Sequence, residues 1–134
     1  MNREEKAIAL HDKKYNCCQA VVGAFCEETG VDGEILFKAA EGFGLGMGCM
    51  EETCGALTGA IMLAGLMHSD GNLNHPGTKA ETYRLSKAMV EEFRKMTGAT
   101  KCGELKGIET GKVLCSCSDC ICCGVKVAEK ILNL

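Results

Sequence analysis

The chain has 134 residues, of which 46% are hydrophobic and 25% charged, and its formal net charge at pH 7 is −3. This length predicts one compact domain over residues 1–134, and the acidic balance disfavours a basic surface for nucleic acid or anionic lipid. A single proline, 4% aromatic residues and few β-branched runs favour helices, so the expected fold class is all-α.

Three helices are predicted in the first third of the chain. Residues 3–13 place a few apolar side chains among charged ones and predict a short first helix. The segments "NCCQAVVGAFCEETG" and "DGEILFKAAEGFG" follow with apolar residues at helical spacing. Their expected capping residues are Asn16, Gly30 and Asp32.

A glycine-rich segment comes next, with glycine at every second position from 42 to 48. This spacing suits neither a helix nor a strand and predicts a loop whose backbone closely approaches another group. Thr53 is the expected cap of a following helix, about 53–68, which is apolar all round and therefore expected at the centre of the fold. Gly55 and Gly59 would let a neighbouring helix or a cofactor come close.

The second half begins with a polar connector and the longest amphipathic helix, residues 78–97. Its inward side is predicted to carry Tyr83, Leu85, Ala88, Met89 and Phe93. Residues 100–107 predict one more helical turn, residues 107–119 a loop, and the apolar residues from Val125 onward a final helix. We therefore expect a compact orthogonal bundle of about five to seven helices.

Neither a secretory signal nor a membrane span is indicated. The N-terminal residues mix charges with a few apolar side chains, and the longest apolar run, residues 54–67, is shorter than the roughly 20 residues of a bilayer span. We expect a cytoplasmic protein. In that reducing compartment cysteines bind metal, hold a cluster or exchange electrons more often than they form a disulfide scaffold. The odd number of cysteines, 11, also excludes complete internal pairing.

Cys54 stands at the predicted start of the apolar helix, directly after the glycine-rich loop. Free backbone amides and the positive end of the helix dipole favour a thiolate there and lower the thiol pKa. Because a thiolate attacks disulfides and ligates soft metals, Cys54 is the expected catalytic residue of a thiol-redox protein. A cysteine that packs as a small buried hydrophobe is the alternative.

The tail contains five cysteines within nine residues: Cys115, Cys117, Cys120, Cys122 and Cys123. The first, third and fifth match the C-x4-C-x2-C spacing of plant-type ferredoxins, whereas the second, third and fifth match the C-x2-C-x2-C run of bacterial ferredoxins. Neither match has a full ligand set, so at least one ligand would come from elsewhere. A mobile, partly oxidised terminus is the alternative.

The other candidate residues give weaker signals. His11, His68 and His75 lack the usual zinc-ligand spacing and are expected to be solvated. The seven methionines are expected to fill the core rather than bind copper. No hydrolase or transferase signature appears, and the glycine-rich loop follows no predicted strand, as a dinucleotide fingerprint would.

Three stretches, "YNCCQAV", "GFGLGMGCMEETCGALTGA" and "KCGELKG", followed by a cysteine before a C-terminal helix, resemble the C_GCAxxG_C_C family, to which redox activity is ascribed. The most specific element, C-G-A-x-x-G, runs here from Cys54 to Gly59. The resemblance covers nearly the whole chain. It implies that the four family cysteines correspond to Cys17, Cys54, Cys102 and Cys120, with Cys123 as the alternative for the fourth.

The resemblance also carries expectations about cofactor and context. Some relatives house an iron–sulfur centre, and family genes often lie near transporter genes, which implies a functional link to a transporter. This chain departs from the family by having Cys49 where a basic residue is common, Glu51 where glycine is often found, and five tail cysteines instead of one. A larger or different metal centre would use Cys123, Cys117 and Cys49 as its second-choice ligands.

The leading hypothesis is a small cytoplasmic redox protein that binds an iron–sulfur cluster through Cys17, Cys54, Cys102 and Cys120 and transfers electrons. One alternative is a metal-free thiol/disulfide oxidoreductase in which Cys54 attacks and another cysteine resolves. Another is a protein that binds zinc or cuprous ion through its tail. The sequence does not identify the redox partner, and the apolar helix with its close-packing glycines could also serve a homodimer.

Overall fold

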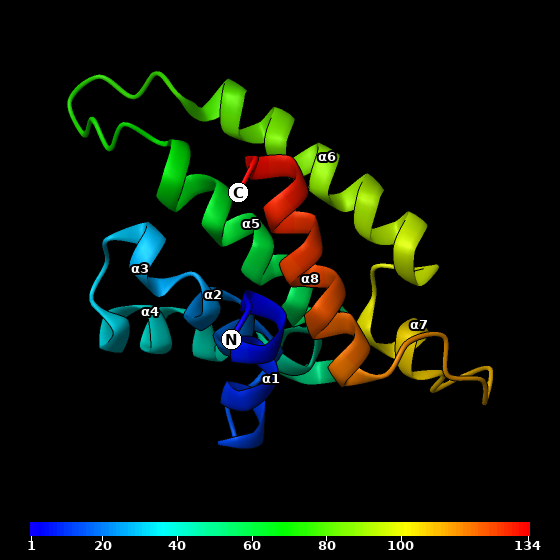
Figure 1. Ribbon diagram of the computed structural model, residues 1–134. Helices are drawn as coiled ribbons and strands as arrows, with labels where there is room; N and C mark the ends of the chain where they lie inside the picture. The colour runs from blue at the N-terminus through cyan, green and yellow to red at the C-terminus, as the bar shows by residue number, and fades with distance from the viewer.

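The computed structural model describes all of residues 1–134 and contains helices but no strand, which confirms the all-α prediction (Figure 1). Two irregular turns, η1 (Glu41–Phe43) and η2 (Gly46–Met50), occupy the glycine-rich segment. The α-helices are α1 (Arg3–Asp12), α2 (Cys17–Ala24), α3 (Cys26–Thr29), α4 (Gly33–Ala40), α5 (Gly55–His68), α6 (Lys79–Thr97), α7 (Cys102–Lys106) and α8 (Cys117–Leu132).

The segment predicted as a single helix over residues 16–30 is divided into α2 and α3, which raises the number of helices to eight. The backbone of Phe25, at φ −112° and ψ 14°, leaves the helical conformation between them. Asn16 caps α2 as predicted: its side chain accepts from the Gln19 backbone N–H, and the Gln19 side chain accepts from the Asn16 N–H, both at 2.9 Å. Gly30 ends α3 in the left-handed conformation, at φ +68°.

The core forms where α5 packs against α2, α6 and α8 (Figure 1). Glycine permits two of these close approaches. A Cβ at Gly59 would lie 3.0 Å from the Val21 Cβ of α2, and a Cβ at Gly124 of α8 would lie 2.7 Å from the Ala56 carbonyl oxygen of α5. These contacts bring the N-terminal ends of α2, α5 and α8 close together.

Two local predictions in the middle of the chain are wrong. Thr53 does not cap α5: it forms an isolated antiparallel bridge with Lys101, and Cys54 occupies the N-cap position. Tyr83 does not face inward, since 66% of its surface is exposed. The other large residues predicted on that side of α6, Leu85, Met89 and Phe93, are buried.

The predicted loop over residues 107–119 ends earlier than expected. The Ser116 hydroxyl accepts a hydrogen bond from the Asp119 backbone N–H at 3.1 Å, so α8 begins at Cys117. Four of the five tail cysteines therefore lie on the first two turns of a helix and not in a loop. None of the helices combines the length and the apolar character needed to cross a bilayer.

Candidate functional site

One cavity of about 200 Å³ is lined by segments that are far apart in the sequence. Its lining includes all four cysteines that correspond to the family positions: Cys17, Cys54, Cys102 and Cys120. Cys115 and Cys117 also line it, which brings six thiols to one place. Apart from these cysteines, the lining consists of His11, Asn16, Leu45, Gly46, Gly55, Leu105 and Lys106.

The four family cysteines all lie at the beginning of a helix. Cys17 is the first residue of α2, Cys54 is the N-cap of α5, Cys102 is the first residue of α7, and Cys120 lies in the first turn of α8. Backbone N–H groups without a partner in the helix, together with the helix dipoles, make such ends favourable for negative charge. The cavity is therefore suited to thiolates or to an anionic group.

A short antiparallel bridge holds Cys54 beside Cys102. The Cys54 N–H donates to the Thr100 carbonyl oxygen at 2.8 Å, and the Cys102 N–H donates to the Glu52 carbonyl oxygen at 2.9 Å. Because each cysteine directly follows a residue of the Thr53–Lys101 bridge, this pairing fixes the start of α5 next to the start of α7.

The glycine-rich segment closes one side of the same region. A Cβ at Gly46, whose φ is +56°, would lie 2.5 Å from the Cys102 Cβ. A Cβ at Gly55 would lie 3.3 Å from the Cys17 Cβ and 3.1 Å from the Cys18 backbone nitrogen. The predicted close approach of this backbone is confirmed, and the groups it approaches are the cysteine-bearing segments themselves.

Cys54 is the thiol that ionises most readily among these neighbours. A hydrogen bond from the Cys120 side chain is the largest cause that lowers the pKa of Cys54, to about 7. Burial opposes this shift, whereas the backbone N–H groups of Ala56 and Leu57 and the charge of Lys106 assist it. The same hydrogen bond, together with burial, raises the pKa of Cys120, so Cys54 is the thiolate of the pair.

The remaining thiols of the cavity behave differently. Burial raises the pKa of Cys17 to about 12, and burial also raises the pKa of Cys102 and Cys115. Burial disfavours the charged form of Lys106, but the charge and hydrogen bond of Cys117, with smaller contributions from other thiols, raise the pKa of this ammonium. Lys106 therefore stays protonated and supplies a positive charge beside the sulfurs.

Only one of the three second-choice ligands lies at the cavity. Cys117 lines the cavity, whereas Cys49 and Cys123 do not. Cys49 is exposed, and its thiol donates to the Gly46 carbonyl oxygen at 3.4 Å. The C-x4-C-x2-C spacing included Cys115 among the tail candidates, but neither Cys115 nor Lys106 was in the predicted ligand set. The one signal for Lys106 was its place in the quoted motif "KCGELKG".

The cysteine-rich donor set is compatible with a metal cofactor. Thiolates are the usual ligands of iron–sulfur clusters and are also preferred by zinc and cuprous ion. No three His, Cys, Asp or Glu side chains lie close enough together to hold one metal ion.

Comparison with known proteins identifies the family of this chain. Residues 15–134 match a protein family described as "Putative redox-active protein (C_GCAxxG_C_C)". No curated protein and no solved structure gives a significant match. Because the match covers nearly the whole chain, the protein belongs to the C_GCAxxG_C_C family of cysteine-rich proteins with ascribed redox activity.

Proposed function

We propose that this protein binds an iron–sulfur cluster in the thiol-lined cavity and functions in electron transfer. The observation that carries the proposal is the convergence of Cys17, Cys54, Cys102 and Cys120 on one cavity. These four thiolates would be the ligands, and the bound cluster would supply one-electron chemistry. The proposal treats residues 1–134 as one domain that works in the reducing cytoplasm, where its thiols stay free.

The surroundings of the cysteines support this proposal. Cluster potentials depend on net charge, on hydrogen bonds to the sulfurs and on exposure to solvent. The Ala56 and Leu57 backbone N–H groups at the start of α5 help to lower the pKa of Cys54, and Lys106 adds a positive charge. Cys54, Cys102 and Cys120 are at most 5% exposed, so the protein excludes water from most of the donor set.

The test is to purify the protein without oxygen and to measure its visible absorption, iron and acid-labile sulfide. We expect a coloured protein that contains iron and sulfide, and loss of both in Cys54→Ser. Cys26→Ser is the matched control, because Cys26 is also half-buried but donates to the Val31 carbonyl oxygen at 3.6 Å, outside the cavity. A colourless, iron-free wild-type protein with a normal helical spectrum would contradict the proposal.

A metal-free thiol/disulfide oxidoreductase is the second candidate, favoured by the lowered pKa of Cys54 and its hydrogen bond with Cys120. In this reaction the Cys54 thiolate attacks a substrate disulfide, forms a mixed disulfide and releases one thiolate. Cys120 then loses its proton and attacks the Cys54 sulfur, which releases the second thiol and leaves a Cys54–Cys120 disulfide.

Counting thiols separates the two candidates. Mild oxidation of the metal-free oxidoreductase should remove two titratable thiols, and mild reduction should restore them. The cluster protein should instead show its change in visible absorption, with Cys54 and Cys120 protected from alkylation while the cluster is bound. A single zinc ion is less well supported than either candidate, since no three ligands are grouped around one position.

A further inference from the structure

The cavity limits the size of any molecule that can react with Cys54. Cys54 and Cys120 are only 5% and 3% exposed, yet both line the cavity of about 200 Å³. This volume has room for several water-sized molecules, since a water takes up about 30 Å³ of the liquid. It is smaller than the pockets of about 300–1,000 Å³ that enclose drug-sized ligands. A molecule with only a few heavy atoms therefore reaches the Cys54 sulfur more readily than a disulfide on a peptide or protein.

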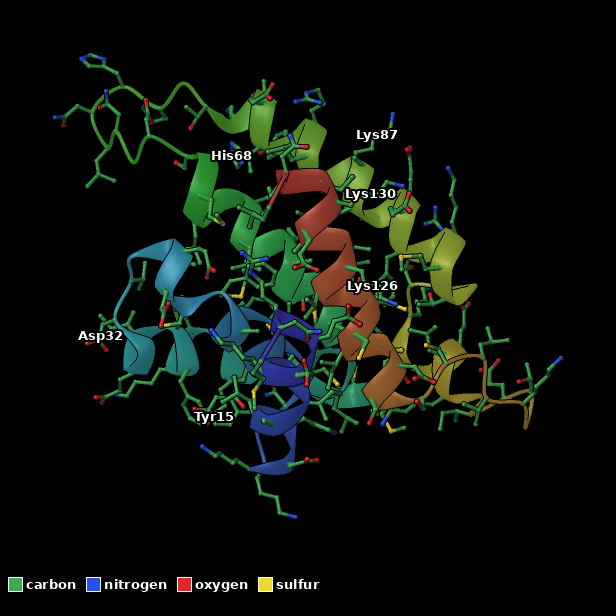
Figure 2. All side chains as sticks on the ribbon, viewed as in Figure 1. Tyr15, Asp32, His68, Lys87, Lys126 and Lys130 are labelled. Atoms are coloured by element: carbon green, nitrogen blue, oxygen red, sulfur yellow. The ribbon has the colours of Figure 1, made fainter.

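The crossing of α5 and α8 holds Cys120 beside Cys54. Gly124 lies one turn after Cys120, and a Cβ there would lie 2.7 Å from the Ala56 carbonyl oxygen. Ala56 in turn is the second residue after Cys54, so this close approach also brings the two cysteines together. Their side chains form a hydrogen bond with each other. Figure 2 shows Lys126 along the outer side of α8, so the contact with α5 uses a different side of the helix.

Hydrogen-bond donors and a positive charge surround the Cys54 sulfur. Cys54 is the N-cap residue of α5, and the backbone N–H groups of Ala56 and Leu57 donate to its side chain. Lys106 lines the same cavity as an ammonium group. When a sulfur attacks one oxygen of a peroxide, negative charge develops on the other oxygen as it leaves. Donors and a cation already in place stabilise that charge without having to reorganise.

We propose that the metal-free protein reduces hydrogen peroxide, with Cys54 as the attacking sulfur and Cys120 as the resolving thiol. The proposal rests on the second candidate function, the thiol oxidoreductase, and assigns a small hydroperoxide as its substrate. A peroxide brings its own oxidising power, so the reaction needs no further oxidant.

The reaction has two steps. The Cys54 thiolate attacks one peroxide oxygen, an S–O bond forms as the O–O bond breaks, and the leaving hydroxide takes a proton to become water. Cys54 is then a sulfenic acid. The Cys120 sulfur attacks the Cys54 sulfur, an S–S bond forms, and the sulfenic oxygen leaves with the Cys120 proton as a second water. The two cysteines together lose two electrons, and the peroxide becomes two waters.

The first test adds one equivalent of hydrogen peroxide to the reduced, metal-free, full-length protein. Mass spectrometry after free thiols are blocked should show two thiols lost for each peroxide consumed, joined as a Cys54–Cys120 disulfide. Cys120→Ser should instead stop at the Cys54 sulfenic acid, which excess dimedone captures. Cys26→Ser is the matched control and should behave like wild type, because Cys26 is half-buried outside the cavity.

The second test measures the size limit in wild-type protein, with the exposed Cys49 as the reference for the intrinsic reactivity of each oxidant. Hydrogen peroxide, cumene hydroperoxide and glutathione disulfide are compared by the rate at which Cys49 and Cys54 lose their thiols. Relative to Cys49, Cys54 should react at least about tenfold faster with hydrogen peroxide than with either larger oxidant, because access limits the rate.

Several outcomes overturn the inference. If Cys54 and Cys49 respond to the three oxidants in the same proportion, the cavity does not select the substrate. A wild-type disulfide from Cys54 to another cysteine, or no dimedone adduct in Cys120→Ser, contradicts the two steps. Oxidation of the pair by glutathione disulfide but not by hydrogen peroxide keeps the oxidoreductase and excludes peroxide as its substrate. Iron and sulfide analysis of the anaerobic protein decides the cluster proposal separately.

Discussion

The two sides of the thiol-lined cavity are built differently. On one side, which we call the glycine wall, Gly46 and Gly55 bring backbone against Cys102 and Cys17, and the Cys54 sulfur is buried. The other side, the tail wall, consists of Cys115, Cys117 and Cys120 where the 107–116 segment enters α8. Close backbone contact leaves the glycine wall little room to change, whereas several thiols on the tail wall can exchange partners.

The two walls differ in the thiols that they present to the cavity. The glycine wall presents one thiol whose pKa is lowered to about 7, which makes it ready to ligate a metal or to attack. On the tail wall the pKa of Cys115 and of Cys120 is raised, as it is for Cys17 and Cys102 on the glycine wall. The tail wall also brings a third thiol, Cys117, to the cavity. We infer that the thiolate on the glycine wall determines the reactivity of the site. The tail wall completes the set of thiols and adjusts their environment.

The largest expected effect comes from removing one thiol of each kind. Cys54→Ser takes the buried thiolate from the glycine wall and should remove nearly all bound iron, because a hydroxyl is a poor ligand for soft metal. Cys115→Ser changes a thiol of the tail wall that is not a proposed ligand and should keep most of the iron. Iron and sulfide analysis of both variants checks this. Equal losses in the two variants would remove the distinction between the walls.

The second effect concerns the contact that joins the walls, where α8 crosses α5. Gly124→Ala puts a Cβ 2.7 Å from the Ala56 carbonyl oxygen, and we expect a loss of about 2 kcal/mol in the free energy of unfolding. Gly65→Ala in α5 is the control, since a Cβ there meets nothing within 4 Å. It should stabilise the protein by about 0.5 kcal/mol through helix propensity. Urea unfolding of the metal-free variants measures both values.

Local features of the fold could be predicted from the sequence, whereas contacts between distant parts of the chain could not. Asn16, Gly30 and Asp32 mark helix ends as expected, because capping depends on neighbouring residues. Thr53 looked equally suited to cap a helix, yet it pairs with Lys101 from a distant part of the chain. A pairing of this kind cannot be predicted from local sequence. The start of α8 was missed because clustered cysteines obscured the apolar periodicity of its first turns.

Part of the candidate site could also be predicted from the sequence. Family resemblance identified Cys17, Cys54, Cys102 and Cys120, which line one cavity. Spacing alone gave two competing ligand sets in the tail, since a cysteine-dense segment matches several patterns at once. The role of Cys115 and the charge of Lys106 follow from how the 107–116 segment folds back, so they required the tertiary structure.

A smaller effect should appear in the pH dependence of the alkylation rate of Cys54 in reduced, metal-free protein. Its pKa of about 7 means that the thiolate dominates above pH 7 and is protonated below it, so alkylation at this residue should fall about tenfold per pH unit well below 7. Cys120→Ala removes the hydrogen bond that contributes most to the shift and should move the midpoint to higher pH. Residue-resolved mass spectrometry of alkylated peptides measures both curves. An unchanged midpoint would mean that the helix end alone activates Cys54.

The smallest effect should come from Lys106→Met, which keeps the length of the side chain and removes its charge. Lys106 contributes less to the low pKa of Cys54 than Cys120 or the backbone N–H groups do. We therefore expect only about a twofold slower alkylation of Cys54 at pH 7, as suits a partly screened charge. With a bound cluster the charge acts on the whole anionic centre, and its removal should lower the reduction potential. A large drop in Cys54 reactivity with no change in potential would place Lys106 beside one sulfur and not beside a shared centre.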